Sequence, residues 1–222
     1  AVLCLKSGNA VILRGSKDIL RSNICLVKLM RQALTEAGLD PDCIALVEDP
    51  SRETATAFMK LSGSLDVLIP RGGAGLIRST VENATVPVIE TGTGNCHVYV
   101  DKDADLEKAL LILMNAKTQR TSVCNACESL LIHRAVADAF GPAAVKALLE
   151  KGVVIHGDET ARTWDSHILP ATEEDYYKEY LALELSVKVV DSAEEAIAHI
   201  NKYSTKHSEC IITRDLDAAQ KF

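Results

Sequence analysis

The sequence predicts an α/β protein whose strands form a parallel sheet with helices on both faces. Two observations predict this class. Short apolar runs without polar alternation are followed by segments with apolar residues at helical spacing, which is typical of strand and helix units in a parallel sheet. The 222 residues are 47% apolar and 25% charged, which is enough apolar material for a core in one large domain or two small ones.

The first ninety residues alternate strands and helices. A β-rich run after Gly8 leads into a segment with helical spacing that ends at Gly38, and the same succession then repeats. We expect strands over 11–13, 44–47, 65–69 and 86–89, and helices over 18–38, 51–61 and 75–84.

The sequence changes character near residue 91, and we expect two domains, 1–90 and 91–222. In the second, Gly141-Pro142 predicts a bend or break in a helix, and the polar stretch 157–180 predicts a surface excursion or partial disorder. The chain starts at Ala1 and stops inside an expected helix, which indicates a fragment. We expect strands over 97–100, 129–133, 153–156, 185–190 and 209–213, and helices over 103–113, 135–150 and 192–201.

Charge and cysteine content narrow the functional classes. A net charge of −7 argues against nucleic acid or an anionic membrane surface as a partner, and no apolar stretch is long enough to span a membrane. The first residues of the sequence do not show the pattern of a secretion signal, and the seven cysteines are scattered, so we expect a reducing, cytoplasmic location. Four of them are expected to be buried small apolar residues: Cys4, Cys25, Cys43 and Cys210.

Cys124 is the strongest candidate for chemistry. It follows a helical segment and lies in the cationic, amide-rich run 115–128, where Lys117, Arg120 and any helix that begins after Ser122 would lower a thiol pKa. This setting favours a nucleophile, with Cys127 as a bystander. The spacing of the two cysteines also fits a redox dithiol or half a zinc site, or a loop whose cysteines only pack.

Two turns are candidate phosphate sites. Arg14, Ser16 and Lys17 follow a strand, where ligands of parallel sheets bind, and the alternative is a pair of solvated cations beside an ordinary turn. Gly72 and Gly73 lie between a strand and a helix, so their amides could cradle a phosphate, although a simple glycine turn explains them equally. We expect the histidines at 199 and 207 to be exposed.

Several segments together resemble the aldehyde dehydrogenase superfamily, and within it the reductases of gamma-glutamyl phosphate. The resemblance runs from end to end and is carried by 4–15, 69–72, 95–101, 115–120 and 124–126. It implies a Rossmann-type cofactor sheet in residues 1–90 and an α/β catalytic domain in 91–222, both incomplete at the chain ends.

The resemblance also implies a reaction. Cys124 would expel phosphate from L-glutamyl 5-phosphate to form a thioester, which NADPH would reduce to L-glutamate 5-semialdehyde in proline biosynthesis. Lys117 and Arg120 are candidates to hold the leaving phosphate. Lys17, with Arg14 and Ser16, suits the 2′-phosphate of NADP, with Gly72 and Gly73 as further cofactor contacts, and Glu179 occupies the place of a glutamate that touches the nicotinamide ribose.

The resemblance also implies partners, and two rival functions stay open. The resemblance implies a homo-oligomer for the full-length protein and functional coupling to glutamate 5-kinase, without a metal. Glu90 matches a general base that oxidising relatives use to activate water, whereas in this reaction phosphate takes the place of water. One rival is an aldehyde dehydrogenase of another substrate class, and the other is a non-enzymatic thiol or metal-binding protein that uses Cys124 and Cys127.

Overall fold

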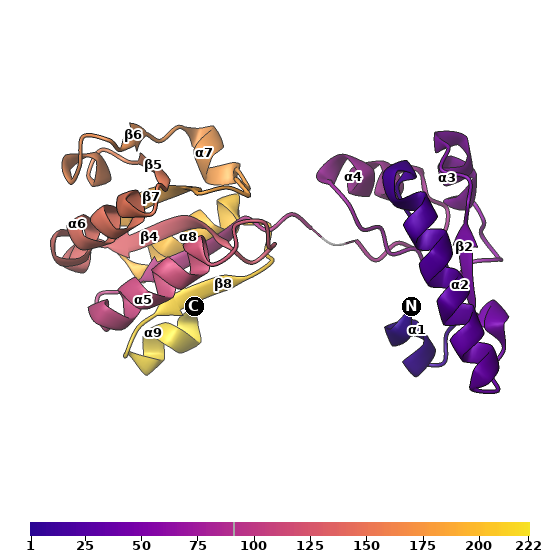
Figure 1. Ribbon diagram of the computed structural model, residues 1–222. Coiled ribbons are helices and arrows are strands. Elements are labelled where there is room, and N and C mark those ends of the chain that lie inside the picture. Colours follow the sequence, from indigo (N-terminus) through magenta and orange to yellow (C-terminus); the bar gives the residue numbers. More distant parts are fainter. Residues whose placement is uncertain (91) are drawn as a thin grey trace. The chain divides into compact units, whose positions relative to one another are not determined.

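The computed structural model describes residues 1–90 and 92–222, apart from the side chain of Ala74 (Figure 1). The chain divides into two compact units, Ala1–Thr91 and Gly92–Phe222. The expected α/β class with parallel strands is confirmed. Position 91, where the second expected domain begins, lies outside the described residues. The assignment of cofactor binding to the first unit and catalysis to the second stays a prediction.

The first unit contains a two-stranded parallel sheet flanked by helices. β1 pairs with β2 in register from Val11 opposite Ile44 to Arg14 opposite Val47. The long helix packs Val27 and Leu34 on Ile44, which gives this unit its small core. Its elements are α1 (Val2–Lys6), β1 (Val11–Arg14), η1 (Lys17–Ile19), α2 (Leu20–Glu36), η2 (Pro41–Cys43), β2 (Ile44–Val47), α3 (Arg52–Phe58) and α4 (Ala74–Asn83).

The expected strands over 65–69 and 86–89 are wrong. These two runs meet in a single parallel bridge between Leu68 and Val88 and do not extend it among the described residues. Val67 and Ile69 are exposed, so burial does not reward a longer ladder. Pro70, which follows the first run, and Pro87, inside the second, carry no N–H to donate.

The second unit is built on a six-stranded parallel sheet in the order β6-β5-β7-β4-β3-β8. Figure 1 shows its helices on both faces of the sheet. Its elements are β3 (Cys96–Val100), α5 (Leu106–Thr118), β4 (Cys127–His133), α6 (Arg134–Glu150), β5 (Val154–Gly157), η3 (Ala161–Thr163), β6 (Leu169–Pro170), α7 (Glu173–Tyr177), β7 (Glu184–Val190), α8 (Ala193–Tyr203), β8 (Glu209–Ile212) and α9 (Leu216–Lys221).

The central strand β4 explains why the sheet is covered on both faces. Leu130 and Ile132 belong to the apolar cluster formed with α5 and α6, whereas Leu131 belongs to the cluster formed with α8. Successive side chains of a strand point to opposite faces, so each β4 residue needs an apolar cover. No helix within residues 1–90 or 92–222 is both long and apolar enough to cross a membrane.

Two expectations for the second unit are corrected. The expected break in α6 is wrong, because the helix runs from Arg134 to Glu150 through Pro142. Gly141 lies so close to the Trp164 ring that an added Cβ would overlap it. The stretch 157–180 is ordered and contains η3, β6 and α7, because Ile168 and Tyr180 are buried and anchor it to the core. The polar composition of this stretch did not indicate that Ile168 and Tyr180 are buried.

A buried aromatic cluster lies behind the start of β3. His199 contacts Tyr176 and Tyr203 with ring centroids 4.9 and 4.4 Å apart, and its edge meets His97 at 5.6 Å. The expected exposure of His199 is therefore wrong, because α8 turns this residue inward. Burial lowers the pKa of His199 to about 3, and its Nε2 has no hydrogen-bond partner among the described residues.

The buried histidine predicts acid sensitivity. Between the ordinary histidine pKa near 6.5 and about 3, the unfolded chain binds a proton at His199 that the folded chain does not. Stability therefore falls as the pH drops through this window, by at most about 1.4 kcal/mol per pH unit for one proton. His199→Phe is expected to flatten the pH dependence of urea unfolding followed by circular dichroism. His167→Phe, at an exposed site, is the control, and an unchanged slope in His199→Phe would contradict the prediction.

Candidate active site

The site is built from connections that precede the strands of the second unit. The strands β7, β4, β3 and β8 are adjacent and parallel, so the segments that lead into them meet at the amino-terminal edge of the sheet. These segments are 92–95, 119–126, 178–183 and 204–208, and hydrogen bonds and close contacts join them across this edge.

Cys124 lies on this edge with an exposed side chain. The segment turns at Val123, whose carbonyl accepts a bond from Ala126 N–H at 3.1 Å, and strand β4 begins at Cys127. No helix starts after Ser122 in this described segment, so the expected helix terminus beside the thiol is absent. The Cys96 thiol donates to the Cys124 carbonyl oxygen at 3.2 Å and fixes the backbone of the turn.

Gly94 brings three of the segments together. A Cβ added to this buried residue would overlap the carbonyl of Cys124, so only glycine allows the two backbones to approach. The Gly94 N–H donates to Glu179 Oε1 at 2.6 Å. Gly94 therefore links Glu179 to the Cys124 turn. The hydrogen bond between Gly94 and Glu179 connects residues that are 85 positions apart in the sequence.

Lys117 does not fit the expected phosphate contact. Its ammonium is fully buried and pairs with the equally buried Glu128 carboxylate at 2.7 Å. Burial raises the pKa of Glu128, and the Lys117 ammonium and the Leu181 N–H, 3.3 Å away, act in the opposite direction. An ammonium in this position is neutralised by its partner and has no face toward solvent. Arg120, in contrast, is exposed on the Cys124 segment.

The cysteines fall into two chemical groups. Burial raises the pKa of Cys96 and of Cys127 to about 12, which makes both thiols poor nucleophiles. Cys127 is buried beside the core whereas Cys124 is exposed, so the pair does not share one environment as a dithiol would. Cys25 is exposed on α2, contrary to the expectation of burial. Within the described residues, no group of three or more His, Cys, Asp and Glu side chains is arranged to hold a metal ion.

Asn95 anchors the segment that carries Gly94. Its side-chain amide donates to the carbonyls of Tyr176 and Tyr203 at 2.8 and 2.9 Å, and its N–H donates to Thr205 at 3.1 Å. The pattern of residue types did not indicate this role, although an Asn inside a fully buried run is a usable signal for an internal polar anchor.

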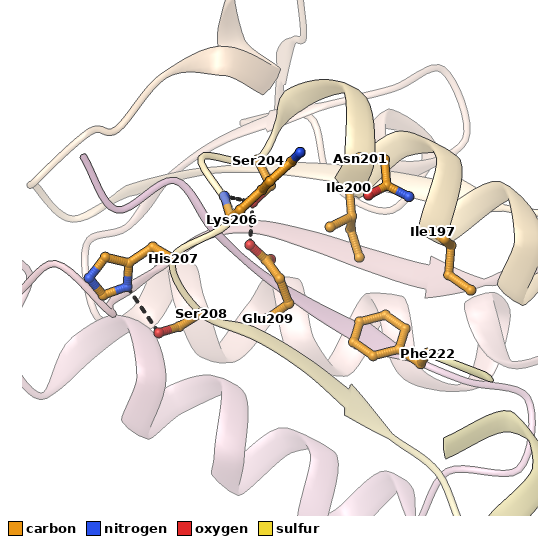
Figure 2. Close-up of a pocket in the computed structure, with 9 residues that line it drawn as sticks. All are labelled: Ile197, Ile200, Asn201, Ser204, Lys206, His207, Ser208, Glu209 and Phe222. Atoms are coloured by element: carbon orange, nitrogen blue, oxygen red, sulfur yellow. Dashed lines mark hydrogen bonds between the residues drawn. The ribbon is translucent and has the colours of Figure 1, made fainter. Parts of the chain in front are cut away.

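A shallow pocket of about 270 Å³ lies beside β8 (Figure 2). Ile197, Ile200 and Phe222 form its apolar side, and the ring of His207 is turned away from them. His207 is exposed, as expected, and its Nδ1 lies 3.8 Å from the Cys96 sulfur. Cys124 does not line this pocket, so the pocket neighbours the candidate site without containing it.

The candidate cofactor residues of the first unit lie at the carboxyl end of β1 and before α4. Ser16 and Lys17 are exposed at the start of η1, which leads into α2, and Arg14 donates to the carbonyls of Pro50 and Ser51 at 3.0 and 3.1 Å. Gly72 and Gly73 are exposed, and Gly73 is the residue before α4. Each group combines a helix start with cations or free backbone, which suits a phosphate.

Comparison with known proteins identifies relatives of the chain. The model of the aldehyde dehydrogenase family matches residues 1–183. A gamma-glutamyl phosphate reductase from Caldicellulosiruptor saccharolyticus is 58% identical over 226 residues, with 100% of this chain and 54% of that protein covered. The crystal structure of the gamma-glutamyl phosphate reductase from Thermotoga maritima superposes with a TM-score of 0.95 at 46% identity, covering 100% of this chain and 53% of that one.

A more distant structure confirms the expected fold. An engineered glycolyl-CoA reductase with bound NADP+ superposes with a TM-score of 0.73 at 22% identity, over 96% of this chain and 56% of that one. The chain therefore has the aldehyde-dehydrogenase-like fold that the resemblance implied, and it spans about half the length of the curated relatives it matches.

The environments of the thiols predict their order of alkylation. Treatment with iodoacetamide at pH 7 and peptide mapping should label Cys124 first, because this side chain is exposed beside the exposed Arg120. Cys96 and Cys127, with a pKa of about 12, should react at least about 100-fold more slowly. Cys25→Ser removes the competing exposed thiol of α2. Labelling of Cys127 at the rate of Cys124 would contradict the prediction.

Proposed function

The chain belongs to the aldehyde dehydrogenase family, and we propose that the protein reduces L-glutamyl 5-phosphate to L-glutamate 5-semialdehyde with release of phosphate, a step of proline biosynthesis. The names of the relatives support this substrate. The observation that carries the proposal is the exposed thiol of Cys124 on a turn that Cys96 and Gly94 hold in place. A fixed, accessible thiol is what attack on an acyl carbon requires.

The reaction divides into two steps at Cys124. The thiolate attacks the acyl carbon, and the bond between this carbon and the phosphate oxygen breaks, so that phosphate leaves with the electron pair and a thioester remains. After reduction of the thioester to a thiohemiacetal, the carbon–sulfur bond breaks, the aldehyde is released and the thiolate is restored. Arg120 is the cation of this segment that is free to face the leaving phosphate, in place of the buried Lys117.

The residues of the first unit fit NADP. Lys17 and Ser16 are exposed at a helix start, where a lysine suits the 2′-phosphate of NADP and an acidic residue would suit the ribose hydroxyls of NAD. Gly15 supports this turn, because an added Cβ would overlap Asn23 of α2. Bound NADPH would supply the hydride. Glu179, which is partly buried, is proposed to contact the nicotinamide ribose.

The rival functions have less support. A dithiol or zinc protein would need Cys127 to act with Cys124, and Cys127 is buried with a raised pKa. An aldehyde dehydrogenase of another substrate class would not need phosphate, and the relatives at 58% identity are reductases of an acyl phosphate. We also propose a homo-oligomeric full-length protein in the cytoplasm, coupled to glutamate 5-kinase because acyl phosphates hydrolyse readily.

The proposed reaction is tested most directly in reverse. The full-length protein, given glutamate 5-semialdehyde and NADP+, should form NADPH only when inorganic phosphate is present. Cys124→Ser should lower this rate by about 10,000-fold, because an alcohol is a far weaker nucleophile than a thiolate. Cys25→Ser is the matched control and should keep the wild-type rate. Phosphate-independent NADPH formation would instead favour an aldehyde dehydrogenase of another class.

The cofactor preference gives a separate test at Lys17. Lys17→Glu should raise the KM for NADPH by about 10- to 100-fold, because it replaces a charge-assisted bond to the 2′-phosphate with repulsion. The KM for NADH should change little or fall. Lys28→Glu makes the same charge change on the exposed side of α2 and serves as the control. An equal effect of the two substitutions on the KM for NADPH would contradict the assignment.

A further inference from the structure

We propose that the Lys117–Glu128 ion pair positions Cys124 for reaction. This inference rests on the proposed function and assigns a task to two residues that do not touch the substrate. The pair brackets the Cys124 turn: Lys117 lies in the last turn of α5, and Glu128 is the second residue of β4. Their bond at 2.7 Å therefore joins the two ends of the connection that carries the Cys124 thiol.

Stability alone does not account for this pair. Both side chains are fully buried, at 0% exposure, and removing two charges from water costs as much as their attraction returns. Apolar side chains of similar volume are as stable in such a position, or more so. We therefore assign this pair a different effect: it determines how the end of α5 and the start of β4 are aligned with each other.

The pair also holds the segment that carries Glu179. The second carboxylate oxygen of Glu128 accepts from the Leu181 N–H at 3.3 Å. Leu181 has a φ of 53°, in the left-handed region that a branched side chain seldom adopts, and the residue is 48% exposed. Because the exposed side chain does not impose this conformation by packing, we assign that role to the hydrogen bond that the Leu181 N–H donates to Glu128.

From Leu181 the contacts lead back to the nucleophile. Glu179, two residues earlier, accepts from Gly94 N–H at 2.6 Å, and Gly94 lies against the Cys124 carbonyl. The ion pair thus acts on the Cys124 turn by two routes. One is direct, at the base of the turn, and the other passes through Leu181, Glu179 and Gly94. Release of the pair should let the turn move without opening the core of the sheet.

The test is a double replacement in the full-length protein, Lys117→Met/Glu128→Leu, which keeps the volume and removes both charges. The melting temperature should stay near the wild-type value. The turnover number should fall by about 100-fold, which is the effect of a displacement of about 1 Å at a reacting atom. The rate of Cys124 alkylation and its pH profile should change as well. A matched control is Lys221→Met/Glu194→Gln, which removes an exposed pair between α9 and α8 and should change none of these quantities.

The inference is overturned if the folded double variant keeps the wild-type turnover number and the wild-type alkylation profile. If the wild-type protein does not turn over the acyl phosphate, the proposed function fails, while the alkylation profile still tests the positioning.

Should the double variant not fold, Glu179→Ala and Glu179→Gln give the answer without turnover. The amide oxygen of Gln still accepts from Gly94, so only the Ala variant should alter Cys124 alkylation. An unaltered profile in Glu179→Ala overturns the route from the ion pair through Leu181, Glu179 and Gly94.

Discussion

The contact between Gly94 and the Cys124 carbonyl is the constraint on which the rest of the site depends. Because the two backbones touch, the segments before β3 and β4 cannot move independently. Their remaining polar groups must then find partners inside the protein, since buried groups without partners are costly. Glu179 accepts from Gly94, Asn95 bonds to the carbonyls of Tyr176 and Tyr203, and the Cys96 thiol binds the Cys124 carbonyl. This one close approach therefore goes together with three fixed side chains, those of Glu179, Asn95 and Cys96.

The second unit separates its core from its chemistry. Apolar strands and helices supply the stability, and the loops at the amino-terminal edge carry the exposed thiol. This edge differs from the carboxyl end at which α/β sheets usually bind ligands, which is where the candidate cofactor residues of the first unit lie. The thiol is accessible because its segment is a turn, and it keeps its position because both neighbouring segments are bonded into the core.

Local patterns predicted most elements of the fold. Apolar runs predicted five of the six strands of the second unit within two residues, and helical spacing predicted its long helices, because burial rewards those patterns directly. The two-residue strand β6 was not predicted. The strand expected over 65–69 was wrong because its side chains are not covered. His199 and the stretch 157–180 were misjudged for the opposite reason, since a few inward-facing side chains in polar surroundings decide their structure and composition does not reveal them.

The site could be predicted only in part. Cys124 was found from its neighbours in the sequence, and its exposure agrees with that choice, but its role stays a prediction. Gly94 was missed because its partners, Cys124 and Glu179, are 30 and 85 positions away, and no local pattern encodes such contacts. Glu128 was missed although Lys117 is only 11 positions away, because the two belong to different elements and no helical or strand spacing relates them. Lys117 was misjudged because a lysine near a cysteine does not reveal which way it points. Trp164, the single tryptophan, has a further consequence: with its ring against the backbone of α6, its emission is an intrinsic optical reporter of the second unit, and denaturation of that unit can be followed without an added dye.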